Sequence, residues 1–155
     1  MRTRGFTLIE MLVVLTIMTL LASAARPLLE LTVQRSKEAE LHHALRTLRA
    51  GIDAYKRAAE MGQVAVRADG TAYPPTLDVL VTGVVDVRSP VLKKIYFLRR
   101  LPRDPFGDPT LPAEQSWGLR ASDSPPDNPR PGRDVFDVFS LSERKALDGT
   151  RYRDW

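Results

Sequence analysis

The sequence predicts an α+β fold in which one long N-terminal helix packs on a small antiparallel sheet. Two stretches favour the helix: an uncharged apolar run at residues 11–25, and a later segment, residues 28–61, in which apolar residues recur at helical spacing. The remainder favours short strands and turns, because every one of the 12 prolines except Pro27 follows residue 70. The helix is therefore expected to have a membrane half and an amphipathic half.

The membrane half is predicted from its length and apolarity. Residues 11–25 carry no charged side chain, and the apolar run that begins just before them is about 20 residues long, which is the length that spans a bilayer. Glu10 lies at the start of this run. Because an ionisable group in such a segment is costly and needs a partner, Glu10 is predicted to be functional.

The amphipathic half is predicted from a stripe of five apolar residues at spacings of four, three, four and three. These residues are Leu41, Leu45, Leu48, Ile52 and Tyr55. Such spacing places them on one face of a helix, with charged residues on the other faces. Gly62 is expected to end the helix, since glycine is favoured just beyond a helix C-terminus.

Two segments of the proline-rich part have the composition of strands. They are residues 117–121 and residues 135–140, and the second is mostly apolar on both of its alternating faces. We expect it to lie between sheet neighbours and the apolar stripe of the helix. A short helix is expected after Pro74 and Pro75, with Thr76 as its N-cap.

The N-terminal motif resembles that of a known family. A short basic segment ends in Gly5 and is followed by Phe6-Thr7-Leu8-Ile9-Glu10 and the apolar run. This arrangement resembles the class III signal of type IV pilins and type II secretion pseudopilins. The resemblance implies that a prepilin peptidase cuts between Gly5 and Phe6 and methylates the new Phe6 amino group. It also implies that Glu10 pairs with the amine of a neighbouring subunit during assembly.

The expected organisation follows from these features. Residues 1–5 form a cleaved leader, 6–26 a transmembrane and assembly helix, 27–62 an amphipathic helix, and 63–155 a small periplasmic head with a C-terminal loop. Pro27 is expected to kink the helix, because an interior proline removes a backbone hydrogen bond, and the pilin resemblance agrees.

Two other interpretations of the N-terminus stay open. A conventional secretory signal would use Arg2 and Arg4 as its basic region and be cleaved after Ala24, which would release a soluble binding domain. A plain signal anchor would hold the same arginines in the cytoplasm by the positive-inside rule. Neither interpretation explains Glu10.

The resemblance extends along most of the chain. Residues 73–76, 98–107, 117–120 and 135–140 occur in the order seen in G-type major pseudopilins of type II secretion. This implies a type IV pilin-like fold and a structural subunit, anchored in the bacterial inner membrane, that polymerises with copies of itself into a periplasmic fibre. The implied partners are minor pseudopilins, the inner-membrane secretion platform and the prepilin peptidase. A minor pilin or pseudopilin at a fibre tip is the alternative within the same class.

The same resemblance implies a possible calcium ion in the C-terminal loop. The candidate ligands are Asp148, Asp154 and the carbonyl oxygen of Leu141. Calcium requires about six to eight oxygen ligands. The loop instead carries four cations, at Arg144, Lys145, Arg151 and Arg153. The alternative is a loop fixed by arginine–aspartate pairs and by packing of Tyr152 and Trp155.

Other functions are disfavoured by composition. The 23 Lys and Arg residues are interleaved with 19 Asp and Glu residues, which argues against a nucleic-acid-binding surface. Cysteine is absent, so disulfides and thiolate chemistry are unavailable. His42 and His43 are the only histidines; adjacent helix positions point about 100° apart, so they are unsuited to share a metal. No histidine is available in the second half to activate a serine, and no enzyme is expected.

Overall fold

The structure is a computed structural model of the 155-residue chain. It describes residue 5, residues 7–66 and residues 70–155, with the side chains of residues 24–28 left out. Most of the predicted leader, together with Phe6 and the side chain of Pro27, lies outside the described residues. The predicted cleavage, methylation and kink therefore stay predictions. The chain divides into two compact units, Met1–Ser36 and Lys37–Trp155.

Helix α1 (Leu8–Glu60) is a single element of 53 residues. Its backbone is helical at position 27, so the proline there does not end the helix. The predicted helix is confirmed in both halves. Among the residues that the structure describes, no helical segment has both the length and the apolarity to cross a membrane.

The C-terminus of α1 is closed by glycine, as the sequence predicts. Gly62 has a φ of +70°, a left-handed conformation that glycine adopts without strain. Its N–H donates to the oxygen of Ala59 at 2.9 Å, and the N–H of Gln63 donates to the oxygen of Ala58 at 2.9 Å. This pair of bonds is the Schellman motif, which satisfies carbonyl groups left without partners at the helix end.

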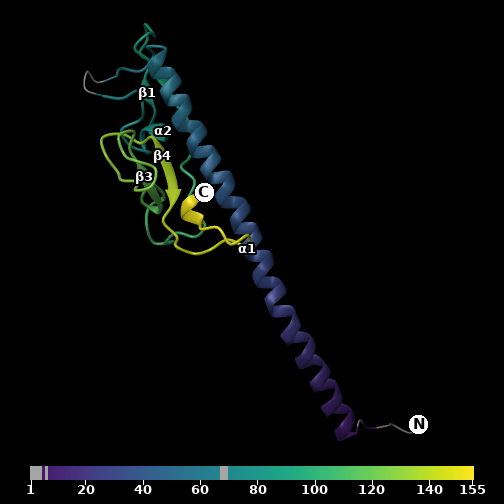
Figure 1. Ribbon diagram of the computed structural model, residues 1–155. Coiled ribbons are helices and arrows are strands. Elements are labelled where there is room, and N and C mark those ends of the chain that lie inside the picture. The colour runs from purple at the N-terminus through teal and green to yellow at the C-terminus, as the bar shows by residue number, and fades with distance from the viewer. Residues whose placement is uncertain (1–4, 6, 67–69) are drawn as a thin grey trace. The chain divides into compact units, whose positions relative to one another are not determined.

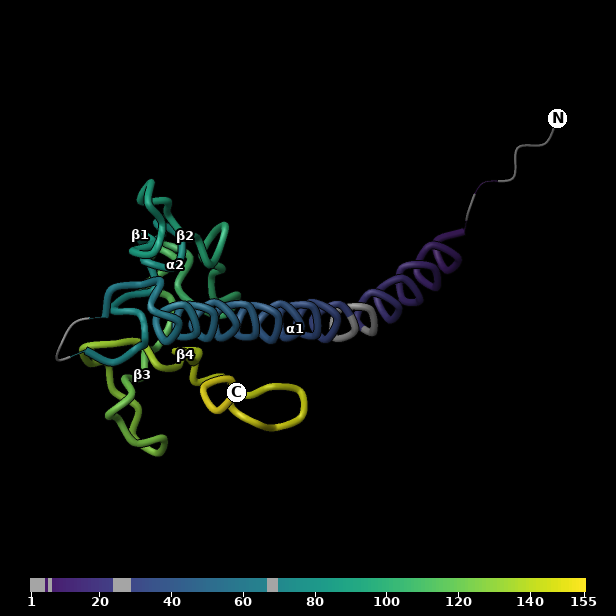
Figure 2. The backbone as a smooth tube through the Cα atoms, turned by 90° about the horizontal axis from the view of Figure 1, so that it is seen from above, coloured from purple at the N-terminus to yellow at the C-terminus, as the bar shows by residue number. Residues whose placement is uncertain are grey.

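The head contains two small antiparallel sheets instead of one. β1 (Val84–Val85) pairs with β2 (Lys94–Ile95), and β3 (Trp117–Arg120) pairs with β4 (Asp137–Ser140). The remaining elements are the short helix α2 (Val79–Thr82) and the 3-10 helices η1 (Ala113–Ser116) and η2 (Tyr152–Asp154). In Figure 1, β4 and η2 lie beside the head portion of α1. Figure 2 shows the two strand pairs on opposite sides of that portion.

The α+β prediction is confirmed, whereas one local prediction is wrong. Strands β3 and β4 fall within the predicted segments 117–121 and 135–140. The short helix α2 begins after Asp78, not after Thr76, and no side chain caps its N-terminus. Residues 74–78 instead hold an irregular path in which Pro74 and Leu77 are buried. Packing of these two side chains therefore determines the local conformation, and the capping preference of threonine does not.

The core lies between α1 and the head. All five residues of the predicted stripe are buried, and Leu41 and Leu48 are fully inaccessible. The side chains packed on them come from α2, β3, β4 and the segments around them, and include Leu77, Leu80, Trp117, Val135, Val138 and Tyr152. The expectation that the sheet covers this stripe is confirmed, because Trp117 of β3 and Val138 of β4 are buried in the same cluster.

Truncation at the centre of this core tests the packing. Leu48→Ala is expected to lower the free energy of unfolding by about 2–5 kcal/mol, because a buried leucine is replaced by a cavity. Arg46→Ala, at an exposed position two residues earlier on α1, serves as the matched control and should change stability by less than about 0.5 kcal/mol. The measurement is denaturant unfolding of the full chain in detergent, and equal effects of the two variants would contradict this core assignment.

Candidate functional site

The N-terminal portion of α1 exposes its apolar side chains. Leu8, Ile9, Leu20 and Leu21 are each at least 63% exposed, and every described side chain from residue 7 to residue 23 is exposed. Soluble proteins rarely leave an apolar helix surface of this length uncovered, so this surface is a candidate for contact with lipid or with another apolar helix. Glu10 is exposed on the first turn of this segment.

Thr7 has a local role at the start of α1 that the sequence analysis missed. The N–H of Glu10 donates to the hydroxyl oxygen of Thr7 at 3.3 Å, and Thr7 directly precedes the first residue of α1. Thr7-Leu8-Ile9-Glu10 has the spacing of a capping box, in which threonine and glutamate satisfy the free donors of a helix N-terminus. A carboxylate in the first turn also interacts favourably with the helix dipole. The signal was present in the sequence as threonine followed three residues later by glutamate.

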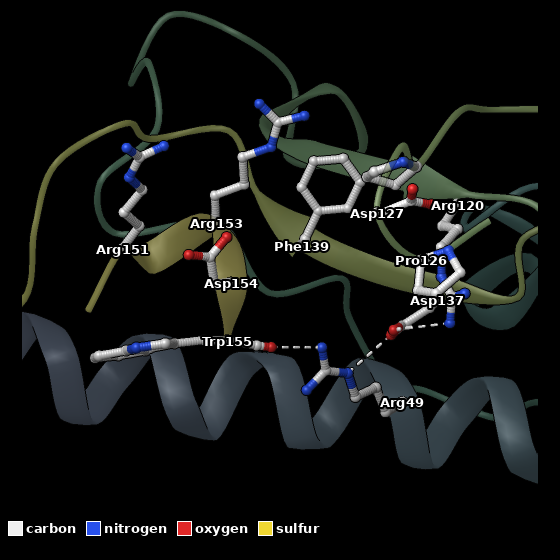
Figure 3. Close-up of a pocket in the computed structure, with 11 residues that line it drawn as sticks. Arg49, Arg120, Pro126, Asp127, Asp137, Phe139, Arg151, Arg153, Asp154 and Trp155 are labelled. Atoms are coloured by element: carbon white, nitrogen blue, oxygen red, sulfur yellow. Dashed lines mark hydrogen bonds and ion pairs between the residues drawn. The ribbon is translucent and has the colours of Figure 1, made fainter. Parts of the chain in front are cut away.

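A polar cleft of about 510 Å³ lies in the head beside β4 (Figure 3). Arg49 of α1 lies at its base, where Nε donates to Asp137 Oδ1 at 2.8 Å and Nη2 donates to the backbone oxygens of Val138 and Trp155 at 3.1 and 2.7 Å. Arg120 of β3 pairs with the other oxygen of Asp137 at 3.6 Å. Arg49 thus connects α1 to β4 and to the last residue of the chain.

The cleft holds charges of both signs and no catalytic pair. Its lining residues are Arg49, Arg120, Pro126, Asp127, Pro129, Asp137, Phe139, Arg151, Arg153, Asp154 and Trp155. Figure 3 shows Arg151 and Arg153 on the side away from Arg49, with the Arg153 guanidinium above the Phe139 ring at 5.7 Å. Among the residues that the structure describes, no serine, threonine, lysine or histidine lines the cleft, so these residues supply neither a hydroxyl or amine nucleophile nor a histidine base there. Its described contacts position β4 and the C-terminal residues.

Two carboxylates in the described part of the head are buried and are held by neutral donors. Asp104 is 5% exposed; one of its oxygens accepts from the Ser140 hydroxyl at 2.5 Å, and the other accepts from the Phe106 N–H at 2.8 Å. Asp134 is 3% exposed and accepts from the Thr71 hydroxyl and from the Ser122 N–H and hydroxyl. Hydrogen bonds of this kind satisfy a buried carboxylate and fix the loops that carry the donors.

The candidate calcium ligands do not form an oxygen-rich cage. Oδ1 of Asp148 accepts from the Thr150 N–H at 2.9 Å and the Thr150 hydroxyl at 2.6 Å, and these bonds hold the pKa of Asp148 below its ordinary value. Asp154 lies instead in the cleft that contains Arg151 and Arg153. In the described part of the chain, no three His, Asp or Glu side chains come together to hold a metal. The residues present therefore do not fit the calcium site that the resemblance implied.

The two histidines are exposed on α1 and have different neighbours. The His42 ring stacks on the Trp155 ring, with centroids 3.9 Å apart and planes 6° from parallel. The only contact described for His43 is made by its backbone oxygen, which accepts from the Thr47 hydroxyl at 2.8 Å. Both histidines are exposed residues of the helix, as the burial pattern along α1 shows. The stack with Trp155 was missed, because nothing local in the sequence relates positions 42 and 155.

Comparison with known proteins places these features in a class. Residues 1–25 match the family model described as the prokaryotic N-terminal methylation motif. Over 108 residues the chain is 31% identical to the type II secretion system core protein G of Klebsiella michiganensis, an alignment that covers 67% of this chain and 68% of that relative. No solved structure is significantly similar to the chain.

The methylation motif, the long helix and the small antiparallel sheets define a prepilin-type protein with a type IV pilin-like fold. Within that class, the chain belongs to the family of the type II secretion system core protein G, and it is a pseudopilin. The resemblance first seen in residues 5–10 and in the head is confirmed. The roles of individual residues at the N-terminus stay predictions.

Asp134 provides a test of how the head is held together at low pH. Burial raises the pKa of Asp134, but the bonds from Thr71 and Ser122 outweigh it and leave the pKa below the ordinary value of 3.8. Because the folded pKa is the lower one, the stabilisation is complete above the unfolded value. It is lost as the pH falls from about 4 through the folded pKa.

We therefore expect the thermal midpoint of the full chain to fall below about pH 4. Asp134→Asn should have a lower thermal midpoint at pH 7, and its midpoint should fall less steeply below about pH 4. Asp127→Asn, in the exposed loop after β3, is the matched control and should reproduce the original profile. The measurement is the midpoint by circular dichroism from pH 3 to pH 7. If the midpoints of the original chain and of Asp134→Asn fell equally steeply below about pH 4, Asp134 would not contribute to the acid sensitivity of the fold.

Proposed function

We propose that this pseudopilin is a structural subunit that polymerises through its N-terminal helix into a periplasmic fibre of a type II secretion system. One observation carries the proposal: α1 begins with an exposed apolar segment, residues 8–23, whose one charged side chain is Glu10. Such a segment suits storage in a bilayer and transfer to contacts with identical helices. The family membership supports the same function, since the relative is a core protein of a secretion system.

Processing is proposed to precede assembly. A prepilin peptidase would cut between Gly5 and Phe6 and methylate the new amino group of Phe6. The match to the N-terminal methylation motif over residues 1–25 supports this step. The alternative cleavage after Ala24 is disfavoured by the fold, because it would cut within α1 (Leu8–Glu60).

The proposed localisation is the bacterial inner membrane, with the head in the periplasm. Arg2 and Arg4 precede the apolar segment and would keep the N-terminus in the cytoplasm by the positive-inside rule. From this position the subunit would meet the membrane platform, minor pseudopilins and copies of itself. It would carry out no catalysis; in this proposal, growth of the fibre moves folded proteins toward the outside of the cell.

The physical step in assembly is the exchange of lipid contacts for helix contacts. Apolar residues gain little from this exchange, because lipid is as apolar as a neighbouring leucine. An ion pair between Glu10 and the Phe6 amine of the next subunit would supply both specificity and register. Such a pair is much stronger in apolar surroundings than in water, since the local dielectric constant is low.

Substitutions at Glu10 separate this ion pair from the capping role. Glu10→Gln keeps a side chain that suits a capping box but removes the charge, so membrane insertion should be retained. The ion pair would be lost, and a loss of ~1.4 kcal/mol or more per contact would reduce fibre yield at least tenfold. Glu10→Leu should behave in the same way. The measurements are the amount of chain in the membrane fraction and the amount of sheared fibre.

Two controls complete the experiment. Thr7→Ala removes the capping oxygen but keeps the carboxylate, and Glu30→Gln makes the same change of charge at another exposed position of α1. Both should still form fibres. Normal fibre yield from Glu10→Gln and Glu10→Leu would overturn the ion pair, and loss of fibres in Thr7→Ala alone would assign the role to capping.

The mature N-terminus distinguishes this function from that of a secreted module. We expect the purified native chain to begin at N-methylated Phe6, and Gly5→Val to leave the leader attached, because the peptidase would no longer accept the site. Intact-mass measurement and N-terminal sequencing give the answer directly. A native chain that begins at Ala25 and is found in the medium would contradict the proposal.

A further inference from the structure

The C-terminal loop, defined here as residues 141–155, is the part of the head in which the sequence left open two ways of fixing the chain. One was a bound calcium ion, and the other was direct packing of the loop. Asp148 is already engaged by Thr150, and Asp154 lies in the cleft with Arg151 and Arg153. The side chains of the loop include four cations and three carboxylates. The described contacts of the loop show in detail what holds it instead.

The tip of the loop is closed by its own backbone. Lys145 and Arg151 form an isolated antiparallel bridge, and the Ala146 N–H donates to the Thr150 oxygen at 2.8 Å. Between them the chain turns at Gly149, whose φ of +89° favours glycine. The Asp148 carboxylate spans the same turn through its two bonds from Thr150. Both ends of the turn are thus joined without an ion.

One carboxylate of α1 anchors the closed tip. Oε1 of Glu38 accepts from the Leu147 N–H at 2.9 Å and from the Tyr152 hydroxyl at 2.9 Å. These donors lie on either side of the turn, so a single glutamate holds both arms of the loop against the helix. Hydrogen bonds to a charged acceptor are about twice as strong as those between neutral groups.

Aromatic stacking secures the remainder of the loop. Tyr152 is fully buried and stacks on Phe106 with centroids 4.0 Å apart. Trp155 lies flat on His42, as described above, and its Nε1 donates to the Thr150 hydroxyl at 2.7 Å. The Arg144 guanidinium lies 5.3 Å from the Phe106 ring, so one loop cation is engaged by an aromatic face.

From these contacts we infer that the C-terminal loop is held on α1 by Glu38 and by the His42–Trp155 stack, and that its conformation does not depend on calcium. The cations that make the loop unsuited to calcium do not disturb this arrangement, because Arg144 and Arg153 lie on aromatic rings. The inference concerns the folded head and does not depend on fibre assembly.

Limited trypsin digestion of the full chain in detergent tests the inference. Trypsin can cut the loop after Arg144, Lys145 and Arg151, which are exposed, at a rate that follows the population of the opened loop. We expect the loop to be cut at the same rate in 1 mM CaCl₂ and in EGTA. A calcium ion bound with a Kd below about 0.1 mM would slow cutting about tenfold or more. Cutting after Lys93, in the exposed turn between β1 and β2, is the internal reference.

The two histidines provide a matched pair of variants. His42→Ala removes the stack on Trp155 and should speed cutting of the loop about two- to tenfold, the range expected for an aromatic contact. His43→Ala changes the adjacent exposed residue and should leave the rate unchanged. Glu38→Ala and Glu40→Ala form a second pair on the same helix, of which the Glu38 variant alone should open the loop.

Two outcomes overturn the inference. If calcium slowed trypsin cutting of the loop about tenfold, a bound ion would hold the loop, and the results from the variants would not change that conclusion. Equal cutting rates for His42→Ala and His43→Ala, together with equal rates for Glu38→Ala and Glu40→Ala, would show that the described contacts do not hold it. Because cutting after Lys93 is followed in the same sample, general unfolding of a variant is distinguished from opening of the loop.

Discussion

The head depends on one constraint: the apolar stripe of α1 must be covered. Its strands are two to four residues long, and an isolated two-stranded pair is marginally stable in water at best. Each strand pair therefore depends on packing against the helix for its stability. Leu41, Leu45 and Leu48 of the helix are buried in the same cluster as the apolar side chains of the head. This explains how a chain of many prolines and no cysteine forms a defined core.

Polar contacts then determine where the long loops run. Asp104 and Asp134 each join segments that are distant in sequence, and Arg49 joins α1 to β4 and to Trp155. The two carboxylates accept hydrogen bonds from backbone N–H and hydroxyl groups, and Arg49 donates to the Asp137 carboxylate and to backbone oxygens. Such groups are expensive to leave without partners, so they restrict the loops to one path even where no regular secondary structure exists.

The sequence allowed prediction of those features that local pattern determines. The stripe of α1, its termination at Gly62 and the positions of β3 and β4 follow from periodicity, glycine and residue type. The β1–β2 pair was not predicted, because strands of two residues carry no usable pattern. The contacts of Glu38 with Tyr152 and of His42 with Trp155 join residues more than 100 positions apart, and one sequence contains no signal of such pairs. The bond from the Glu10 N–H to the Thr7 hydroxyl was predictable, since its spacing is local.

The two portions of α1 differ in how their apolar side chains are covered. In the head portion, apolar residues occupy one face and are covered by the chain itself. In the first portion, apolar residues surround the helix and remain exposed, which makes sense only if another molecule covers them. An apolar partner alone would not fix how far one helix is shifted along another. A single carboxylate at a fixed position can fix this shift, because it must meet its counter-charge. Within one subunit the Glu10 carboxylate lies in the first turn of α1, where it interacts favourably with the helix dipole, and its proposed pairing with a neighbouring subunit is compatible with that position.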